Sequence, residues 1–210
     1  MKVDDTLQSA VPFLIVFLGY LLGSLPFGLW LVRLFRGVDI RQYGSGNIGT
    51  TNVLRVGGPG LALLVLVADA GKGWLPVWLA RTLDLGEGTA VLAGVAAMAG
   101  HSWSVWLRFR GGKGVATGLG VLIGLDGRVA LVAVATWLAV VLVTRYSSLG
   151  SMTAALSVPL IMAWLHAPVP QLVFGVIAFL VVLVRHRSNI QRLLRREELP
   201  ITLQIDVRGR

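Results

Sequence analysis

The sequence contains no cysteine, and charged residues make up only 14% of its 210 positions. Without thiols the chain can form no disulfide, no thiolate metal site and no cysteine nucleophile. A soluble domain usually carries about a quarter charged residues. Because charge is scarce here and 55% of the residues are hydrophobic, the composition predicts a polytopic membrane protein rather than a water-soluble enzyme.

Acidic residues are also few, 10 against 19 lysines and arginines. They form no cluster of the kind that holds a divalent cation, so we expect neither a metal nor another cofactor. The basic excess does not require a nucleic-acid partner, because Lys and Arg gather in the cytoplasmic loops of membrane proteins, beside anionic headgroups. No low-complexity linker divides residues 1–210, which are therefore expected to form a single membrane domain.

Long apolar runs predict where the chain crosses the membrane. The last run is far longer than the roughly 20 residues of one crossing. The sequence HAPVP divides it at 166–170, since proline cannot continue a helix interior. The runs therefore predict six crossings. They cover residues 11–32, 61–80, 89–107, 129–144 and 146–184.

The short apolar segment 114–125 could be re-entrant or a seventh crossing, because it covers only about 18 Å as a helix. Charge distribution decides between these alternatives. If the segment crosses, fifteen of the 19 basic residues fall on one side, including every arginine after Val184. The positive-inside rule therefore favours seven transmembrane helices in an all-α fold, with the N-terminus outside and the C-terminus in the cytoplasm.

Every unusual polar stretch then lies on the cytoplasmic side. Glycines let backbone N–H groups approach an anion, and helix N-termini, Lys and Arg add positive potential, so the set is typical of a phosphate site. Each stretch alone has a simpler explanation as a capped loop, a basic turn or a helix on headgroups. Together they favour phosphate binding. They are GSGNIGTTNVLR (44–55), GHSWSVWLRFRGGKGVAT (100–117), RYSSLGS (145–151) and RHRSNIQRLLRREE (185–198).

Two charges lie inside the apolar run 61–80. Asp69 and Lys72 are three residues apart, so they share one face of a helix. Charges within a membrane are costly and mark function by default, although a buried ion pair that only fixes packing is the alternative. His101, near a predicted helix end, either belongs to the site or bonds a backbone carbonyl.

The stretches at 45–55, 100–117 and 185–193 closely resemble the three signatures of the bacterial acyl-phosphate:glycerol-3-phosphate acyltransferases. DAGKGWLPV at 69–77 resembles a further recurrent feature of that family. The likeness extends from about residue 12 to residue 198. The segment LRREE at 194–198 differs from the family pattern, in which this ending usually contains glycine. The resemblance implies a small enzyme of the bacterial inner membrane with seven crossings and a cytoplasmic-side active site.

The resemblance also implies the reaction. A fatty acyl group passes from acyl phosphate to the 1-hydroxyl of glycerol 3-phosphate, which gives lysophosphatidate and inorganic phosphate in the first acylation of phospholipid synthesis. The expected partners are these two substrates and membrane lipids, with no nucleic acid. The residues it assigns to catalysis are Ser45, Arg55, Lys113, Ser148, His186 and Asn189. Those it assigns to substrate binding are Asn47, Thr51, Asn52, Gly111, Gly112 and Gly114, and Asp69, Lys72 and His101 are added to the predicted binding residues because of their place in the membrane or near a helix end.

The sequence lacks the general base of many glycerolipid acyltransferases, a His-x4-Asp pair. Trp106 and Gln191 stand where His101 and His186 would need an aspartate. An acyl phosphate is a mixed anhydride with a good leaving group, so it needs orientation and charge stabilisation more than a strong base. Two acceptors for the hydroxyl proton remain open, a phosphate oxygen of the donor and His186.

Two other functions fit parts of the pattern. An anion transporter also uses glycine-broken helices and basic helix ends, but it would place polar residues in both halves of the membrane, whereas polarity here collects on one side. A CDP-alcohol phosphotransferase needs several aspartates for divalent metals, and the apolar runs contain only Asp69. The acyltransferase interpretation explains more of the sequence, and the glycine-rich segment 114–125 would leave a groove for the acyl tail.

Overall fold

The computed structural model describes residues 3–201, with side chains from residue 9 onward. Lys2, Arg208 and Arg210, which entered the charge count, lie outside this part. The described residues form helices and no strand, which confirms the all-α prediction. The helices are α1 (Val3–Ser24), α2 (Phe27–Arg36), α3 (Thr50–Gly57), α4 (Pro59–Thr82), α5 (Gly86–Ser102), α6 (Val115–Leu125), α7 (Gly127–Thr144), α8 (Ser147–Trp164), α9 (Val169–Arg185) and α10 (Arg187–Leu194), with short 3-10 turns η1 (Ile40–Gln42) and η2 (Val105–Leu107).

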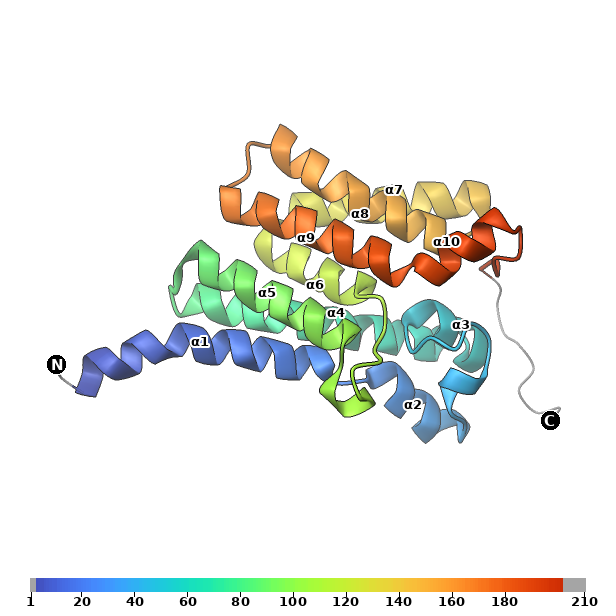
Figure 1. Cartoon of the computed structure of the whole chain (residues 1–210), viewed down its shortest axis with the longest axis horizontal. Helices are drawn as coiled ribbons and strands as arrows, with labels where there is room; N and C mark the ends of the chain where they lie inside the picture. The colour runs from blue at the N-terminus through green and yellow to red at the C-terminus, as the bar shows by residue number, and fades with distance from the viewer. Residues whose placement is uncertain (1–2, 202–210) are drawn as a thin grey trace.

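The long helices form one bundle. In Figure 1, α1 and α4 to α9 lie lengthwise, while α2, α3, α10 and the α5–α6 connection gather at the end opposite the start of α1. Within the described residues, 5 helical segments are long and apolar enough to span a membrane, and α9 with α10 would make a sixth, although the two are bent by 57°. α6 is apolar but has only 11 residues. The all-helical membrane architecture is clear, and the seventh crossing stays a prediction.

The predicted crossing over residues 11–32 is not one uninterrupted helix. α1 ends at Ser24 and α2 begins at Phe27, because Pro26 has no N–H to donate and restricts the residue before it. Lys72 donates from Nζ to the Leu25 carbonyl at this break, at 2.7 Å. A buried side chain of α4 therefore donates a hydrogen bond to the backbone at the break between α1 and α2.

The other helix boundaries differ less from the predicted apolar runs. The predicted division at 166–170 is confirmed, since α8 ends at Trp164 and α9 begins at Val169. The run 89–107 is helical only to Ser102, after which the chain turns through η2. Ser104 donates to the Ser24 carbonyl at 2.6 Å, so this turn is attached to the end of α1.

Glycines let the helices approach closely, as is common between membrane helices. A Cβ at Gly73 of α4 would collide with the Thr117 carbonyl of α6, and a Cβ at Gly120 of α6 would collide with the Ala70 carbonyl of α4. Gly23 packs in the same way against Ala97 of α5. The backbones of α4 and α6, and of α1 and α5, are therefore in direct contact.

The packing divides the bundle into two groups of helices. α4 packs mainly on α5 and α6, whereas α7 packs mainly on α8, and α8 also packs on α9. The groups meet through α6 with α7 and α5 with α9. The main cavity lies between these groups.

Candidate active site

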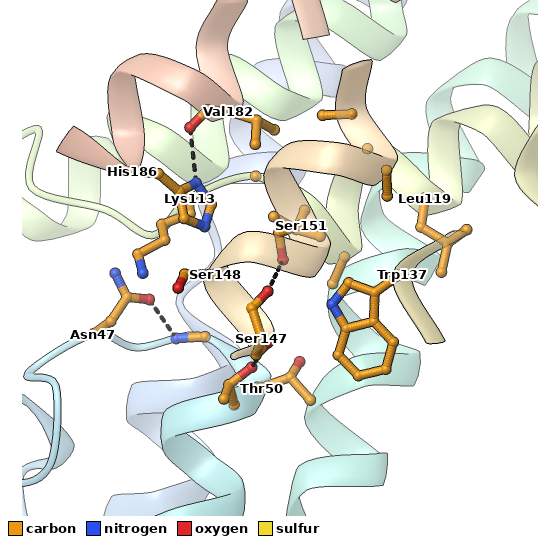
Figure 2. A pocket seen from close by; sticks show the side chains of 18 of the residues that line it. Asn47, Thr50, Lys113, Leu119, Trp137, Ser147, Ser148, Ser151, Val182 and His186 are labelled. Atoms are coloured by element: carbon orange, nitrogen blue, oxygen red, sulfur yellow. Dashed lines mark hydrogen bonds between the residues drawn. The ribbon is translucent and has the colours of Figure 1, made fainter. Parts of the chain in front are cut away.

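A cavity of about 470 Å³ opens at the end of the bundle where α3, α10 and the α5–α6 connection meet. It is polar at that end and apolar farther along α6 to α9. Figure 2 shows Lys113 and Asn47 on one side, Ser147, Ser148 and Ser151 next to them, and Leu119 and Trp137 on the opposite side. Twelve of the fifteen residues predicted for the site line it. The exceptions are Lys72, Gly111 and Gly112.

Asn52 organises the loop before α3. Its side chain is buried, accepts from the Ser45 N–H at 2.9 Å, and donates to the carbonyls of Tyr43 at 3.0 Å and Asn47 at 2.9 Å. One amide thus closes a loop whose residues face the cavity. Thr51, beside it, shares a hydroxyl hydrogen bond of 2.9 Å with Ser147 of α8. The first predicted motif therefore both shapes the site and joins its two walls.

The glycine loop before α6 packs against the end of α5. The Gly112 N–H donates to the His101 carbonyl at 2.9 Å, and a Cβ at Gly112 would collide with the His101 ring. Arg185 donates to the carbonyls of Gly111 at 2.7 Å and Gly112 at 2.9 Å. Glycine is needed here for close packing, and this packing fixes the backbone immediately before Lys113.

Lys113 stands at the centre of a buried polar network. Its ammonium donates to Asn189 Oδ1 at 2.6 Å, and Asn189 Nδ2 donates to Glu198 Oε1 at 2.6 Å. Ser148 donates to the same oxygen at 2.8 Å, and Arg192 donates to Oε2 at 2.8 Å. Burial lowers the pKa of Lys113 to about 8, and the Glu198 carboxylate opposes this shift.

Arg55 extends from α3 to the segment after α10. It donates to the carbonyls of Leu199 and Pro200, both at 3.0 Å. Burial lowers the pKa of Arg55, and the negative charge of Glu198 opposes this change. The guanidinium therefore holds the chain around Glu198 against the site, a contact that the sequence did not predict.

His186 lies at the bend between α9 and α10, fully enclosed by protein. Nδ1 is 2.8 Å from the Val182 carbonyl; a carbonyl can only accept, so Nδ1 carries the hydrogen and Nε2 is left as an acceptor. Burial, together with the positive charge of Lys113, lowers the pKa of His186 to about 4. The imidazole is therefore neutral at physiological pH and a weak base.

The intramembrane charges form an ion pair, with Lys72 Nζ 2.7 Å from Asp69 Oδ1. Asp69 and His101 line the cavity, whereas Lys72 lies behind them and bonds the Leu25 carbonyl. His101 Nδ1 is 3.8 Å from Asp69, too far for a hydrogen bond. Lys72 therefore has a structural role, because it pairs with Asp69 and bonds the carbonyl just after α1, whereas Asp69 and His101 face the cavity.

Sequence reasoning missed Glu198, although an acid next to an arginine-rich helix was a visible signal. It also left Arg185 and Ser147 without roles, because their partners are far away in the sequence. Arg192 was left without a role too, although its partner Glu198 is only six residues away. Arg196, within the LRREE segment, adopts a left-handed conformation with φ of 59°. The chain turns at this residue, shortly before the Glu198 carboxylate that accepts hydrogen bonds from Ser148, Asn189 and Arg192.

Comparison with known proteins decides the family. A family model described as glycerol-3-phosphate acyltransferase matches residues 13–196. The chain belongs to the glycerol-3-phosphate acyltransferase family. Among relatives of that name, the Mesorhizobium japonicum protein is 52% identical over 176 residues, covering 84% of this chain and 89% of that protein. The Synechococcus protein is 49% identical over 181 residues, covering 86% and 90%.

Two solved structures are also similar to this acyltransferase. Both are crystal structures of PlsY, an integral membrane glycerol 3-phosphate acyltransferase. The glycerol 3-phosphate form matches with a TM-score of 0.87 and 38% identity, over 91% of this chain and 96% of that one. The lysophosphatidic acid form matches with 0.85 and 38%, over 90% and 95%. The chain is thus an integral membrane acyltransferase of phospholipid synthesis.

Proposed function

We propose that this acyltransferase uses acyl phosphate as donor and the 1-hydroxyl of glycerol 3-phosphate as acceptor. The observation that carries the proposal is one cavity with a cationic end and an apolar end. The apolar end suits a fatty chain, and the cationic end suits phosphate. The two crystal forms of PlsY, with glycerol 3-phosphate and with lysophosphatidic acid, support the acceptor and the product.

A second, more polar cavity of about 380 Å³ supports a reaction between two phosphate compounds. It adjoins the first, and Ser45, Asn47, Lys113 and Arg192 line both. Arg185 and Arg187 line only the second. Lys113 therefore lies where it can contact an anion on either side.

The reaction forms one ester bond, breaks one bond of the mixed anhydride and transfers one proton. The 1-hydroxyl oxygen attacks the acyl carbonyl carbon, the bond from that carbon to the phosphate oxygen breaks, and the hydroxyl proton leaves. Lys113 stabilises negative charge, while Ser45, Ser148 and Asn189 offer hydrogen bonds. Because the pKa of His186 is only about 4, we favour transfer of the proton to a phosphate oxygen of the donor, released as inorganic phosphate.

The proposal is tested with purified protein given only an acyl phosphate and glycerol 3-phosphate. We expect lysophosphatidate and inorganic phosphate in equal amounts. Transfer should survive excess chelator, since among the side chains described for residues 9–201 no three His, Asp or Glu converge on a metal site. Strict dependence on a divalent metal, or transfer only from a thioester, would show that the donor or mechanism is wrong.

We also propose seven crossings, with the site on the cytoplasmic side of the inner membrane. The absence of native cysteine makes single-cysteine labelling clean. Gln42→Cys and Arg110→Cys, both exposed, should react with an impermeant maleimide only after the inner membrane is opened. Gly88→Cys, at a position with open space around it, should react in cells whose inner membrane is intact. The reverse pattern would overturn the orientation.

A further inference from the structure

We infer that the apolar end of the main cavity limits the length of the acyl chain, through four residues that close it at one level. These four, called the floor, come from four different helices. This inference rests on the proposed function, because it takes the fatty chain as the occupant. The floor residues are Leu122 of α6, Ala133 of α7, Val158 of α8 and Phe174 of α9.

The floor is closed by packed side chains beneath it. One turn farther along α6, α7 and α8 lie Leu125, Val129 and Met162, which are buried in the apolar core and line no part of the cavity. Phe174 itself is completely buried. A chain that follows these helices from the polar end therefore meets packed protein at the floor.

The depth of the cavity suits a fatty chain. From Ser148 to Val158 the cavity follows α8 for ten residues, and from His186 to Phe174 it follows α9 for twelve. At 1.5 Å per residue these distances are about 15 and 18 Å. An extended chain of single bonds advances about 1.2 Å per bond. The polar end and the floor are thus separated by roughly 12 to 15 bonds.

Small side chains keep the space above the floor open. Gly118, Ala154 and Ala178 line the walls of the cavity and have no atom beyond Cβ. Ala178 lies one turn above Phe174 on α9. A larger side chain at Ala178 should therefore raise the floor by about one turn, 5.4 Å, which corresponds to about four carbons.

Ala178→Leu and Ala133→Leu test the inference, with Ala135→Leu as the matched control. Ala135 lies on α7 two residues from Ala133 and is exposed, so the same atoms are added outside the cavity. Each purified variant is given an equimolar mixture of acyl phosphates of graded chain length, and the products are measured by mass spectrometry. We expect the preferred length to fall by about four carbons in Ala178→Leu, to fall less in Ala133→Leu, and to stay unchanged in Ala135→Leu.

A second measurement, of ligand binding, tests the floor in variants that fold but do not transfer acyl groups. Single-chain lysophosphatidates of graded length should raise the melting temperature of the folded protein up to a length limit, and Ala178→Leu should lower that limit. If the wild type transfers acyl groups but neither cavity variant changes the product profile or this limit, the floor is wrong and the proposed function stands. If the protein uses no acyl phosphate but the length limit for lysophosphatidate binding moves as expected, the assignment of the donor is wrong and the floor is supported.

Discussion

Lys113→Ala is expected to reduce the turnover of acyl transfer by about 100-fold or more, because a charge contact made in the transition state is lost. The ammonium lies between the two cavities and is held by Asn189 at 2.6 Å. The fold should tolerate the change, since the backbone of this loop is fixed by Arg185 and His101 rather than by the lysine side chain.

Arg110→Ala is the matched control for the Lys113 variant. It removes one positive charge from the same loop at an exposed position, so it should retain near-normal turnover. Lys113→Arg should restore activity only partly, because a planar guanidinium does not replace a compact ammonium in a close-packed glycine loop. Purified, folded Lys113→Ala protein with normal turnover would contradict the role of this residue in phosphate binding.

Glu198→Gln is expected to move the alkaline limb of the pH–rate profile to lower pH and to reduce turnover by roughly tenfold. Burial tends to raise the pKa of this carboxyl, but hydrogen bonds from Asn189, Ser148 and Arg192 outweigh burial and lower it. Glu198 is therefore ionised at neutral pH and acts as the buried counter-ion of this network. Without that charge, the pKa of Lys113 should fall below its value of about 8.

The sign of the pH effect follows from the lysine. Activity that needs the ammonium is complete below the Lys113 pKa and is lost as pH rises through it, so a lower pKa moves that loss toward neutral pH. The measurement is kcat/KM against pH, which reports the free enzyme. Glu197→Gln removes the same charge from the neighbouring exposed residue and should leave the limb in place. Identical profiles for the two variants would rule out Glu198 as the counter-ion.

Local features of the sequence determined the class of the protein and most of its site. The length and spacing of apolar runs predicted the membrane helices, because a span needs a fixed number of apolar residues whatever surrounds it. Ser45, Ser148, His186 and Asn189 stood in motifs whose residue types already suited phosphate chemistry. Such signals can be read from neighbouring residues alone.

Other features depend on contacts between distant parts of the chain, and only the tertiary structure decided them. Gly112 looked like part of a phosphate cradle, yet its missing side chain makes room for the His101 ring. Arg55 looked free to bind phosphate, but it holds the carbonyls of Leu199 and Pro200, more than 140 residues away. No spacing rule predicts such pairs, because they arise from how the helices pack.

The cavity is also a feature that only the tertiary structure decided. Its floor exists because four helices place side chains at one level, and each side chain alone is an ordinary apolar residue of a membrane helix. The sequence by itself determined that this chain is a helical membrane protein with the motifs of an acyltransferase. Packing decided where the acyl chain can end and which carboxylate balances the charge of Lys113, because both depend on distances between helices that the order of residues does not state.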